Sequence, residues 1–150
     1  MPLQVLLPGG QRLKGHVPLL PSLPMREGKG TILVLDDEPS LRLLCRVNLE
    51  LEGYRVLEAA TLEEARIAMD DEPVDAALLD MHVGSERGLD LIPELRALEP
   101  PAAVVVLSGT SEVSPETRAK VDGVLGKPFA LDELAQTVER VLTGTRQSPA

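Results

Sequence analysis

The sequence predicts an α/β fold in which a parallel sheet of five strands carries helices on both faces. Short apolar runs alternate with segments of helical periodicity five times between residues 31 and 142. Strands that alternate with helices in this way are parallel and are joined by right-handed crossovers, so the helices are divided between the two faces. We therefore expect a doubly wound sheet.

The expected strands are short and apolar. TILVLD at residues 31–36 is bounded by turn residues and has the composition of a strand that is buried on both faces. AAVVVLSG at residues 102–109 carries a run of valines, which strongly favours β-structure. The other strands are expected at residues 54–59, 74–80 and 123–128, the last being the shortest.

The expected helices have recognisable start or stop signals. Pro39 suits the first turn of a helix, and Gly53 ends that helix. Thr61 and Glu64 form a capping box. Pro93 lies inside the helix expected at residues 89–98 and should weaken or bend its first turns. The inward face of the helix that Pro39 begins is expected to contain Leu41, Leu44, Cys45, Asn48 and Leu51. That of the helix after the capping box is expected to contain Leu62, Ala65, Ala68 and Met69. A last helix begins near Leu131, and its inward face is expected to contain Leu134, Ala135, Val138, Val141 and Leu142.

The two ends of the chain differ from its middle. Prolines interrupt every apolar run in residues 1–28, which we interpret as a disordered extension. Translation starts either at Met1 or at Met25, because MREGKG would be an ordinary lead into the first strand. One folded domain is then expected at residues 29–143, followed by a flexible tail at residues 144–150.

Composition excludes several classes of function. The net charge is −9 and the pI is near 4.7, so the chain lacks the basic character that nucleic-acid binding requires. A single cysteine, Cys45, cannot form an internal disulfide or a multi-cysteine zinc site, which favours the reducing cytoplasm. No apolar run approaches the roughly 20 residues that span a bilayer, so no membrane partner is expected.

Polar residues gather where the expected strands end. Ligands of open α/β sheets bind beyond the carboxyl ends of the strands. The residues at these ends are Asp36, Asp37, Asp80, Ser108 and Lys127. Three carboxylates form a hard oxygen site that suits Mg²⁺, and a lysine and a serine hydroxyl add donors for phosphoryl oxygens. This combination indicates phosphoryl transfer, with the isolated Asp80 as nucleophile. The structural alternative for Asp36 and Asp37 is a helix N-terminus that uses acids to complement its dipole.

Four segments in register carry a resemblance to a known family. ILVLDDEP, ALLDMHVGSERGLDL, VVVLSG and GVLGKPF resemble the signature blocks of bacterial two-component response regulator receiver domains. The resemblance covers residues 30–142. It implies a flavodoxin-like sheet with strand order 2-1-3-4-5 in a stand-alone domain like the chemotaxis regulators. It also implies that the protein is cytoplasmic and is not an enzyme in the usual sense.

The resemblance also implies a role for each polar residue. Asp80 would accept a phosphoryl group from a sensor histidine kinase. Asp37, Asp80 and the backbone carbonyl of His82 would hold Mg²⁺, with Asp36 assisting directly or through water. The His82 side chain is expected to be a partly exposed loop group. The phosphoryl group would then be contacted by Ser108 and Lys127, with access left by Gly109 and with a cis peptide bond before Pro128.

Three features depart from the family pattern. Relatives usually have a proline near Gly84, so the loop at residues 82–88 is expected to be more mobile here. Val124 replaces the aromatic residue that often acts as a switch, and the short segment between Ser108 and Val124 predicts a truncated or irregular helix. The last two departures fall on the face from the fourth helix to the fifth, which relatives use for output and which is the expected surface for a possible homodimer.

Three functions therefore remain open at this stage. The first is a receiver that signals to an effector protein in trans or serves as a phosphate relay. The second is an interaction module that keeps the fold without the phosphorylation switch, which Val124 favours. The third is an aspartyl-phosphate phosphohydrolase with Asp36 as its nucleophile. Such enzymes usually place a second Asp where this chain has Glu38.

Overall fold

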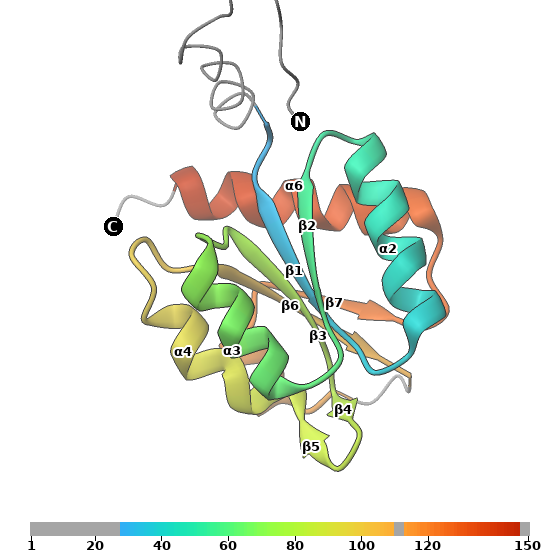
Figure 1. Cartoon of the computed structure of the whole chain (residues 1–150), viewed down its shortest axis with the longest axis vertical. Helices are drawn as coiled ribbons and strands as arrows, with labels where there is room; N and C mark the ends of the chain where they lie inside the picture. Colours follow the sequence, from blue (N-terminus) through green and yellow to red (C-terminus); the bar gives the residue numbers. More distant parts are fainter. Residues whose placement is uncertain (1–27, 110–112, 148–150) are drawn as a thin grey trace, which may run out of the picture.

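The central feature of the computed structural model, which describes residues 28–109 and 113–147, is one parallel sheet (Figure 1). Its strands run in the order β2-β1-β3-β6-β7. Counted within this sheet alone, that order is 2-1-3-4-5, which confirms the predicted topology. The strands are β1 (Thr31–Leu35), β2 (Arg55–Ala59), β3 (Ala76–Asp80), β6 (Ala103–Ser108) and β7 (Gly123–Gly126).

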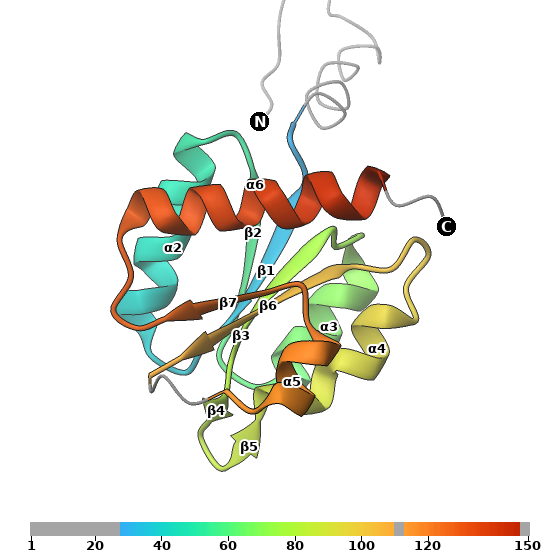
Figure 2. The ribbon, with the colours of Figure 1, turned by 180° about the vertical axis from the view of Figure 1, so that it is seen from behind.

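Helices cover both faces of the sheet, as predicted. Helices α2 (Pro39–Leu51) and α6 (Leu131–Gln147) pack on one face, and α3 (Leu62–Asp71) and α4 (Ile92–Arg96) pack on the other (Figures 1 and 2). Helix α5 (Pro115–Lys120) follows β6 on the side of α4. None of the described helices is long and apolar enough to cross a membrane.

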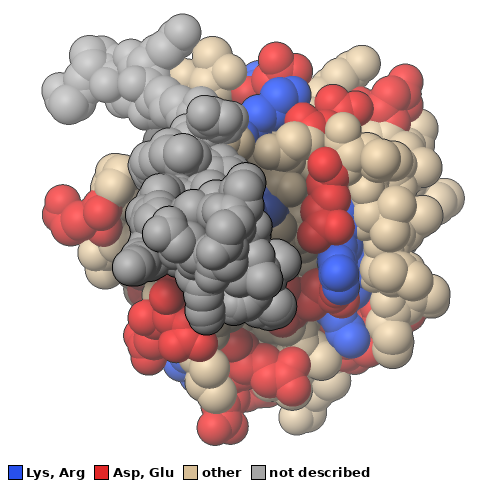
Figure 3. Space-filling model, turned by 45° about the horizontal axis from the view of Figure 1, so that its top comes forward, with Lys and Arg blue, Asp and Glu red and all other residues tan. Residues whose placement is uncertain are grey.

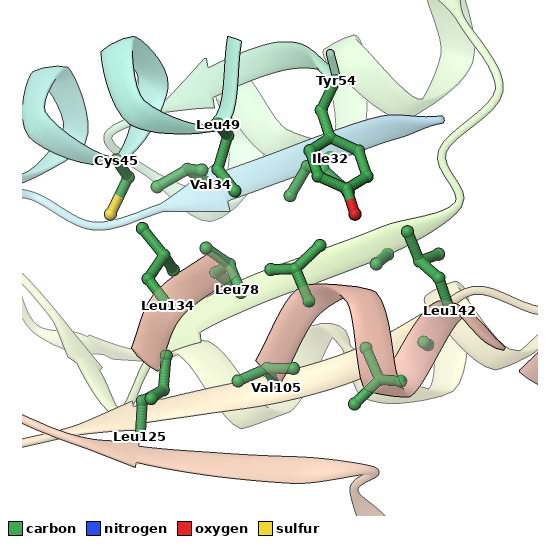
Figure 4. Close-up of a cluster of buried hydrophobic side chains, with 14 of the residues drawn as sticks. Ile32, Val34, Cys45, Leu49, Tyr54, Leu78, Val105, Leu125, Leu134 and Leu142 are labelled. Atoms are coloured by element: carbon green, nitrogen blue, oxygen red, sulfur yellow. The ribbon is translucent and has the colours of Figure 1, made fainter. Parts of the chain in front are cut away.

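The central strands bury side chains on both faces, so the hydrophobic core is divided in two. Ile32 and Val34 of β1 point to the cluster under α2 and α6, which Figure 4 shows. Leu33 and Leu35 point to the cluster under α3 and α4. This alternation explains why the central strands β1, β3 and β6 are apolar at successive residues rather than at every second residue.

The buried face of α2 differs from the predicted one. Leu44 is 43% exposed and Leu51 is 80% exposed, whereas Cys45 and Leu49 are fully buried. Leu41 is partly buried against the same cluster. The core-facing residues thus follow the spacing i, i+4, i+8, which lies on one side of a helix. The predicted inward residues of α3 and of α6 face the core, with the exception of Ala135, which is half-buried and lines a surface pocket between α6 and α2.

The segment around Pro93 is divided into a 3-10 turn and a short helix. A 3-10 turn, η1 (Gly88–Leu91), precedes the helix, and Pro93 lies in the first turn of α4 rather than inside a longer helix. A proline tolerates that position because its missing N–H would have no partner there. The predicted weakening at Pro93 therefore takes the form of a separate, shorter helix.

Two further predictions concern loops. Helix α5 has six residues, which agrees with the expected truncation, although residues 110–112 lie outside the described part. The loop at residues 82–88, which was expected to be more mobile than in relatives, contains β4 (His82–Val83) and β5 (Glu86–Arg87), which pair as a small antiparallel hairpin. The predicted extension, residues 1–28, lies outside the described residues except for Gly28.

Candidate functional site

The predicted polar residues meet at the carboxyl edge of the sheet. Asp36 directly follows β1, Asp80 ends β3 and Ser108 ends β6. Leu35 is paired with Leu79, and Ser108 is paired with Gly126. Because parallel neighbours in register end at the same level, Lys127, which follows β7, arrives beside the acidic residues.

Three carboxylates form the centre of the site. One ligand oxygen from each of Asp36, Asp37 and Asp80 lies within 4.8 Å of the others. Asp36 is fully buried and Asp80 is 9% exposed, whereas Asp37 is exposed. Like charges at this separation and burial repel one another strongly, so the cluster needs compensating groups.

Lys127 compensates the two buried carboxylates. Its Nζ lies 3.0 Å from Oδ2 of Asp36 and 3.4 Å from Oδ1 of Asp80. Burial lowers the pKa of Lys127, but hydrogen bonds and charges from Asp36 and Asp80 outweigh this effect and raise the pKa above its usual value. The ammonium group is therefore charged throughout the physiological range.

The pKa of the Asp80 carboxyl is raised above its ordinary value. Burial raises the pKa of its carboxyl, and the negative charge of Asp36 raises it further, while Lys127 acts in the opposite direction. A carboxylate with a raised pKa is more basic and hence a better nucleophile when ionised. This environment distinguishes Asp80 from an ordinary surface aspartate.

Backbone groups and one arginine hold Asp36. Its Oδ1 accepts a hydrogen bond from the Glu38 N–H at 2.9 Å, and its main-chain carbonyl accepts one from Arg42 at 2.6 Å. Arg42 also forms an ion pair with Glu58 at 3.3 Å. Arg42 could not be identified as a site residue from the sequence, because a basic residue in the first turns of a helix does not by itself indicate its partner on a strand.

The β4–β5 hairpin contacts the remaining carboxylate. The Gly84 N–H donates to Oδ2 of Asp37 at 2.9 Å. The hairpin thus supplies a backbone donor that reaches the acidic cluster. His82 begins the hairpin, is exposed, and pairs in register with Arg87.

A second glycine is required by the packing of the same loop. A Cβ added to Gly88 would lie 1.9 Å from the carbonyl oxygen of Asp80. The Gly88 N–H also donates to the carbonyl of Met81 at 3.2 Å. Gly88 therefore lets the chain return closely over the end of β3, a role that the sequence alone did not reveal.

The other predicted site residues border the cluster. Ser108 is 2% exposed, and its carbonyl accepts a hydrogen bond from the Lys127 N–H at 2.7 Å. Gly109 is exposed, Val124 is half-buried, and the peptide bond between Lys127 and Pro128 is cis. Beside them lies a groove, lined by Glu38, Leu41, Leu44, Gly109, Lys127, Pro128 and Phe129.

The donor set fits a small hard cation. The chemistry of carboxylate oxygens matches the preference of Mg²⁺, and the exposure of Asp37 leaves room for retained water ligands. Asp36, Asp37 and Asp80 are the side chains that would hold it. Figure 3 brings forward the opposite end of the domain, where the described basic side chains lie beside acidic ones and do not form a separate patch.

Fold and site together define a class: a doubly wound α/β domain with an acidic cluster and a lysine at the carboxyl edge of its sheet. Residues 32–139 match the family described as response regulator receiver domain. The chain belongs to this family, whose members are signalling domains rather than enzymes in the usual sense.

Individual relatives support the same assignment. The chain is 35% identical over 105 residues to the transcriptional regulatory protein KdpE of Mycobacterium tuberculosis, covering 68% of this chain and 46% of that protein. It is 32% identical over 111 residues to the alginate biosynthesis transcriptional regulatory protein AlgB of Pseudomonas aeruginosa, covering 72% of this chain and 25% of that one. The chain thus spans less than half the length of these relatives.

Solved structures agree with the fold. A CheY-like receiver domain protein from Methanospirillum hungatei superposes with a TM-score of 0.70 at 24% identity, covering 79% of this chain and 97% of that one. The response regulator TrrA from Thermotoga maritima, solved in complex with Mg²⁺-BeF, gives a TM-score of 0.67 at 31% identity, covering 75% of this chain and 98% of that one.

Proposed function

We propose that Asp80 accepts a phosphoryl group from a histidine of a sensor kinase in a reaction that requires Mg²⁺. The observation that carries this proposal is the position of the Asp80 carboxylate, which lies in a three-carboxylate cluster and 3.4 Å from the Lys127 ammonium. The Mg²⁺-BeF complex of TrrA supports the choice of cation.

The transfer step requires little covalent machinery. An oxygen of Asp80 bonds to phosphorus while the P–N bond of the phosphohistidine breaks, and the imidazole nitrogen keeps the electron pair of that bond. The product is an acyl phosphate on Asp80. A Mg²⁺ ion held by the carboxylates would spread the negative charge of the transferring group. Lys127 and Ser108 are placed at the same edge, where they would donate to phosphoryl oxygens.

The buried nucleophile argues against the phosphohydrolase alternative. Asp36 is fully buried, and both of its carboxylate oxygens already accept hydrogen bonds, from Glu38 and Lys127. An attacking carboxylate must present an oxygen to the incoming phosphorus atom, and the complete burial of Asp36 disfavours this. Asp80 is the more accessible of the two, which favours it as phosphoacceptor.

The proposed output is a change of affinity for an effector protein in trans or for a further relay protein. Phosphorylation adds roughly −1.5 to −2 charges to the site. A coupling of about 1 to 3 kcal/mol to a binding face is enough for a useful switch. A module that binds partners independently of phosphorylation is the second candidate, because Val124 lacks the aromatic group and α5 has six residues.

The test is incubation with acetyl phosphate and Mg²⁺, followed by intact-mass measurement. The wild type should gain one phosphoryl group, and both Asp80→Asn and treatment with a chelator should abolish the gain. Asp70→Asn is the matched control, because Asp70 is an exposed acid on α3. A wild type without any adduct, or an undiminished adduct in Asp80→Asn, rejects the proposal. Partner binding that is identical for wild type and Asp80→Asn would favour the second candidate.

A further inference from the structure

A hydrogen bond links the β4–β5 hairpin to Asp37, the most solvent-exposed carboxylate of the cluster. Lys127 forms ion pairs with Asp36 and Asp80, whereas the bond recorded for Asp37 comes from the Gly84 N–H at 2.9 Å. Asp37 is also exposed, so its side chain would otherwise be free to change rotamer. The Gly84 amide therefore restrains the carboxylate that most needs restraint.

The hairpin is itself held in place, so this amide has a defined position. Val83 is 2% exposed and belongs to the core cluster under α3 and α4. On the other strand, the Glu86 carboxylate accepts a hydrogen bond from the Leu62 N–H at the start of α3, at 3.3 Å. Between these two anchors, Gly84 adopts a φ of 63°, which a glycine reaches without strain.

We propose that the β4–β5 hairpin is a positioning element for the cation site, and that the Gly84 N–H orients the Asp37 carboxylate toward Asp36 and Asp80. This inference rests on the proposed Mg²⁺ dependence. A carboxylate has about four acceptor positions, so Oδ2 can keep the Gly84 bond while the carboxylate also binds a cation. The Gly84 amide and the cation therefore do not compete for the Asp37 carboxylate.

The expected effect follows from the general behaviour of groups that orient metal ligands. Loss of a hydrogen bond to a ligand typically weakens metal binding by about 10-fold to 100-fold. The lower limit applies here, because Asp37 is exposed and water can replace the lost donor in part. We therefore expect the dissociation constant for Mg²⁺ to rise by about 10-fold when the Gly84 N–H is removed.

The first measurement compares two substitutions at one position by NMR titration of the full chain with Mg²⁺. Gly84→Pro removes the N–H, but it also fixes φ at about −65°, far from the observed 63°. Gly84→Ala keeps the N–H, has open space for its Cβ, and shares with proline the unfavourable positive φ. The proline variant should bind Mg²⁺ about 10-fold more weakly than the wild type, whereas the alanine variant should bind it within about twofold of the wild type. Equal binding by wild type and Gly84→Pro overturns the inference. Equal weakening by both substitutions also overturns it, because the cause would then be hairpin shape.

The second measurement does not need the proline variant to fold. In an Asp37→Ala variant, the Gly84 amide should exchange with solvent about 10-fold faster than in the wild type, equivalent to about 1.4 kcal/mol. The Gly88 amide, which donates to Met81 in the same loop, is the internal control and should not change. Unchanged exchange at Gly84 contradicts the inference, and so does faster exchange when Mg²⁺ is added to the wild type.

These outcomes separate the inference from the proposed function. If the wild type binds Mg²⁺ and accepts phosphate while Gly84→Pro behaves identically, only the role of the hairpin is wrong. If the wild type binds no Mg²⁺, the proposed dependence on the cation fails, and the positioning role fails with it.

Discussion

Replacing Lys127 with methionine removes the ammonium group that lies between Asp36 and Asp80. The two carboxylates would then face each other in a largely buried site without a positive charge. Removing one partner of a fully buried ion pair costs about 3 to 5 kcal/mol. The Lys127 side chain is 23% exposed and that of Asp80 is 13% exposed, so water relieves part of this cost. We expect the free energy of unfolding to fall by about 2 kcal/mol near neutral pH.

The loss should depend on pH in a defined direction. Burial and the charge of Asp36 raise the pKa of Asp80 above its ordinary value of 3.8, and removing Lys127 should raise it further. An acid with a raised pKa in the folded state favours folding below its unfolded value, and this contribution is lost as the pH rises through the folded value. The variant should therefore approach the stability of the wild type as the pH falls from neutral toward the folded pKa of Asp80. Added Mg²⁺ should also recover part of the loss at neutral pH.

Urea denaturation followed by far-UV circular dichroism measures this change, because the chain has no tryptophan. Lys29→Met is the matched control, since Lys29 lies 3.9 Å from Glu52 with both side chains 51% exposed. Such a surface pair is worth less than about 1 kcal/mol. The reasoning is refuted if the two variants lose the same stability, or if the loss in Lys127→Met is independent of both pH and Mg²⁺.

Three further predictions concern packing. Gly88→Ala should destabilise the fold by at least about 2 kcal/mol, because its Cβ would meet the Asp80 carbonyl at 1.9 Å; Gly144→Ala, in an open position on α6, should instead stabilise it by about 0.5 to 1 kcal/mol in the same urea titration. Leu49→Ala should cost about 3 kcal/mol, whereas Leu51→Ala, at 80% exposure, should change the unfolding midpoint little; equal effects would reject the observed orientation of α2. Burial raises the pKa of the Cys45 thiol to about 11, so reaction with DTNB near pH 8 should proceed only as fast as the chain unfolds; rapid reaction of the native protein would contradict this burial.

The positions of the strands and of the polar carboxyl edge could be predicted from sequence because one physical rule governs both. A strand that is buried on both faces is apolar along its whole length, so its end is marked by the first polar residue. In β1 and β3 that residue is an aspartate, Asp36 or Asp80. The topology then brings these ends together, and no knowledge of side-chain contacts is needed.

The orientation of α2 could not be predicted in the same way, because apolar residues occur on several sides of this helix. Leu43, Leu44, Val47 and Leu51 all remain substantially exposed, while Leu49 is buried. A periodicity with apolar residues at so many positions is compatible with more than one inward face. Only the direction in which the helix crosses the sheet decides between them.

The hairpin and its hydrogen bond to Asp37 could not be predicted from the sequence for a different reason. HVGSER contains one buried apolar residue, Val83, so it lacks the alternation that marks a strand. The bond from Gly84 to Asp37 joins residues 47 apart and involves a backbone N–H, which every residue except proline carries. The sequence therefore showed that the loop departs from the family pattern but indicated mobility instead of a contact.

The charges at the carboxyl edge explain why a divalent cation suits this site. The carboxylates of Asp36, Asp37 and Asp80 carry three negative charges, and Lys127 supplies one positive charge, which leaves a balance of −2. The Glu38 and Gly84 N–H groups reduce repulsion through their dipoles but add no net charge. A second lysine would neutralise only half of the balance and would block the exposed side of the cluster. A doubly charged ion held by these carboxylates would neutralise all of it and would supply a positive charge for an incoming phosphoryl oxygen.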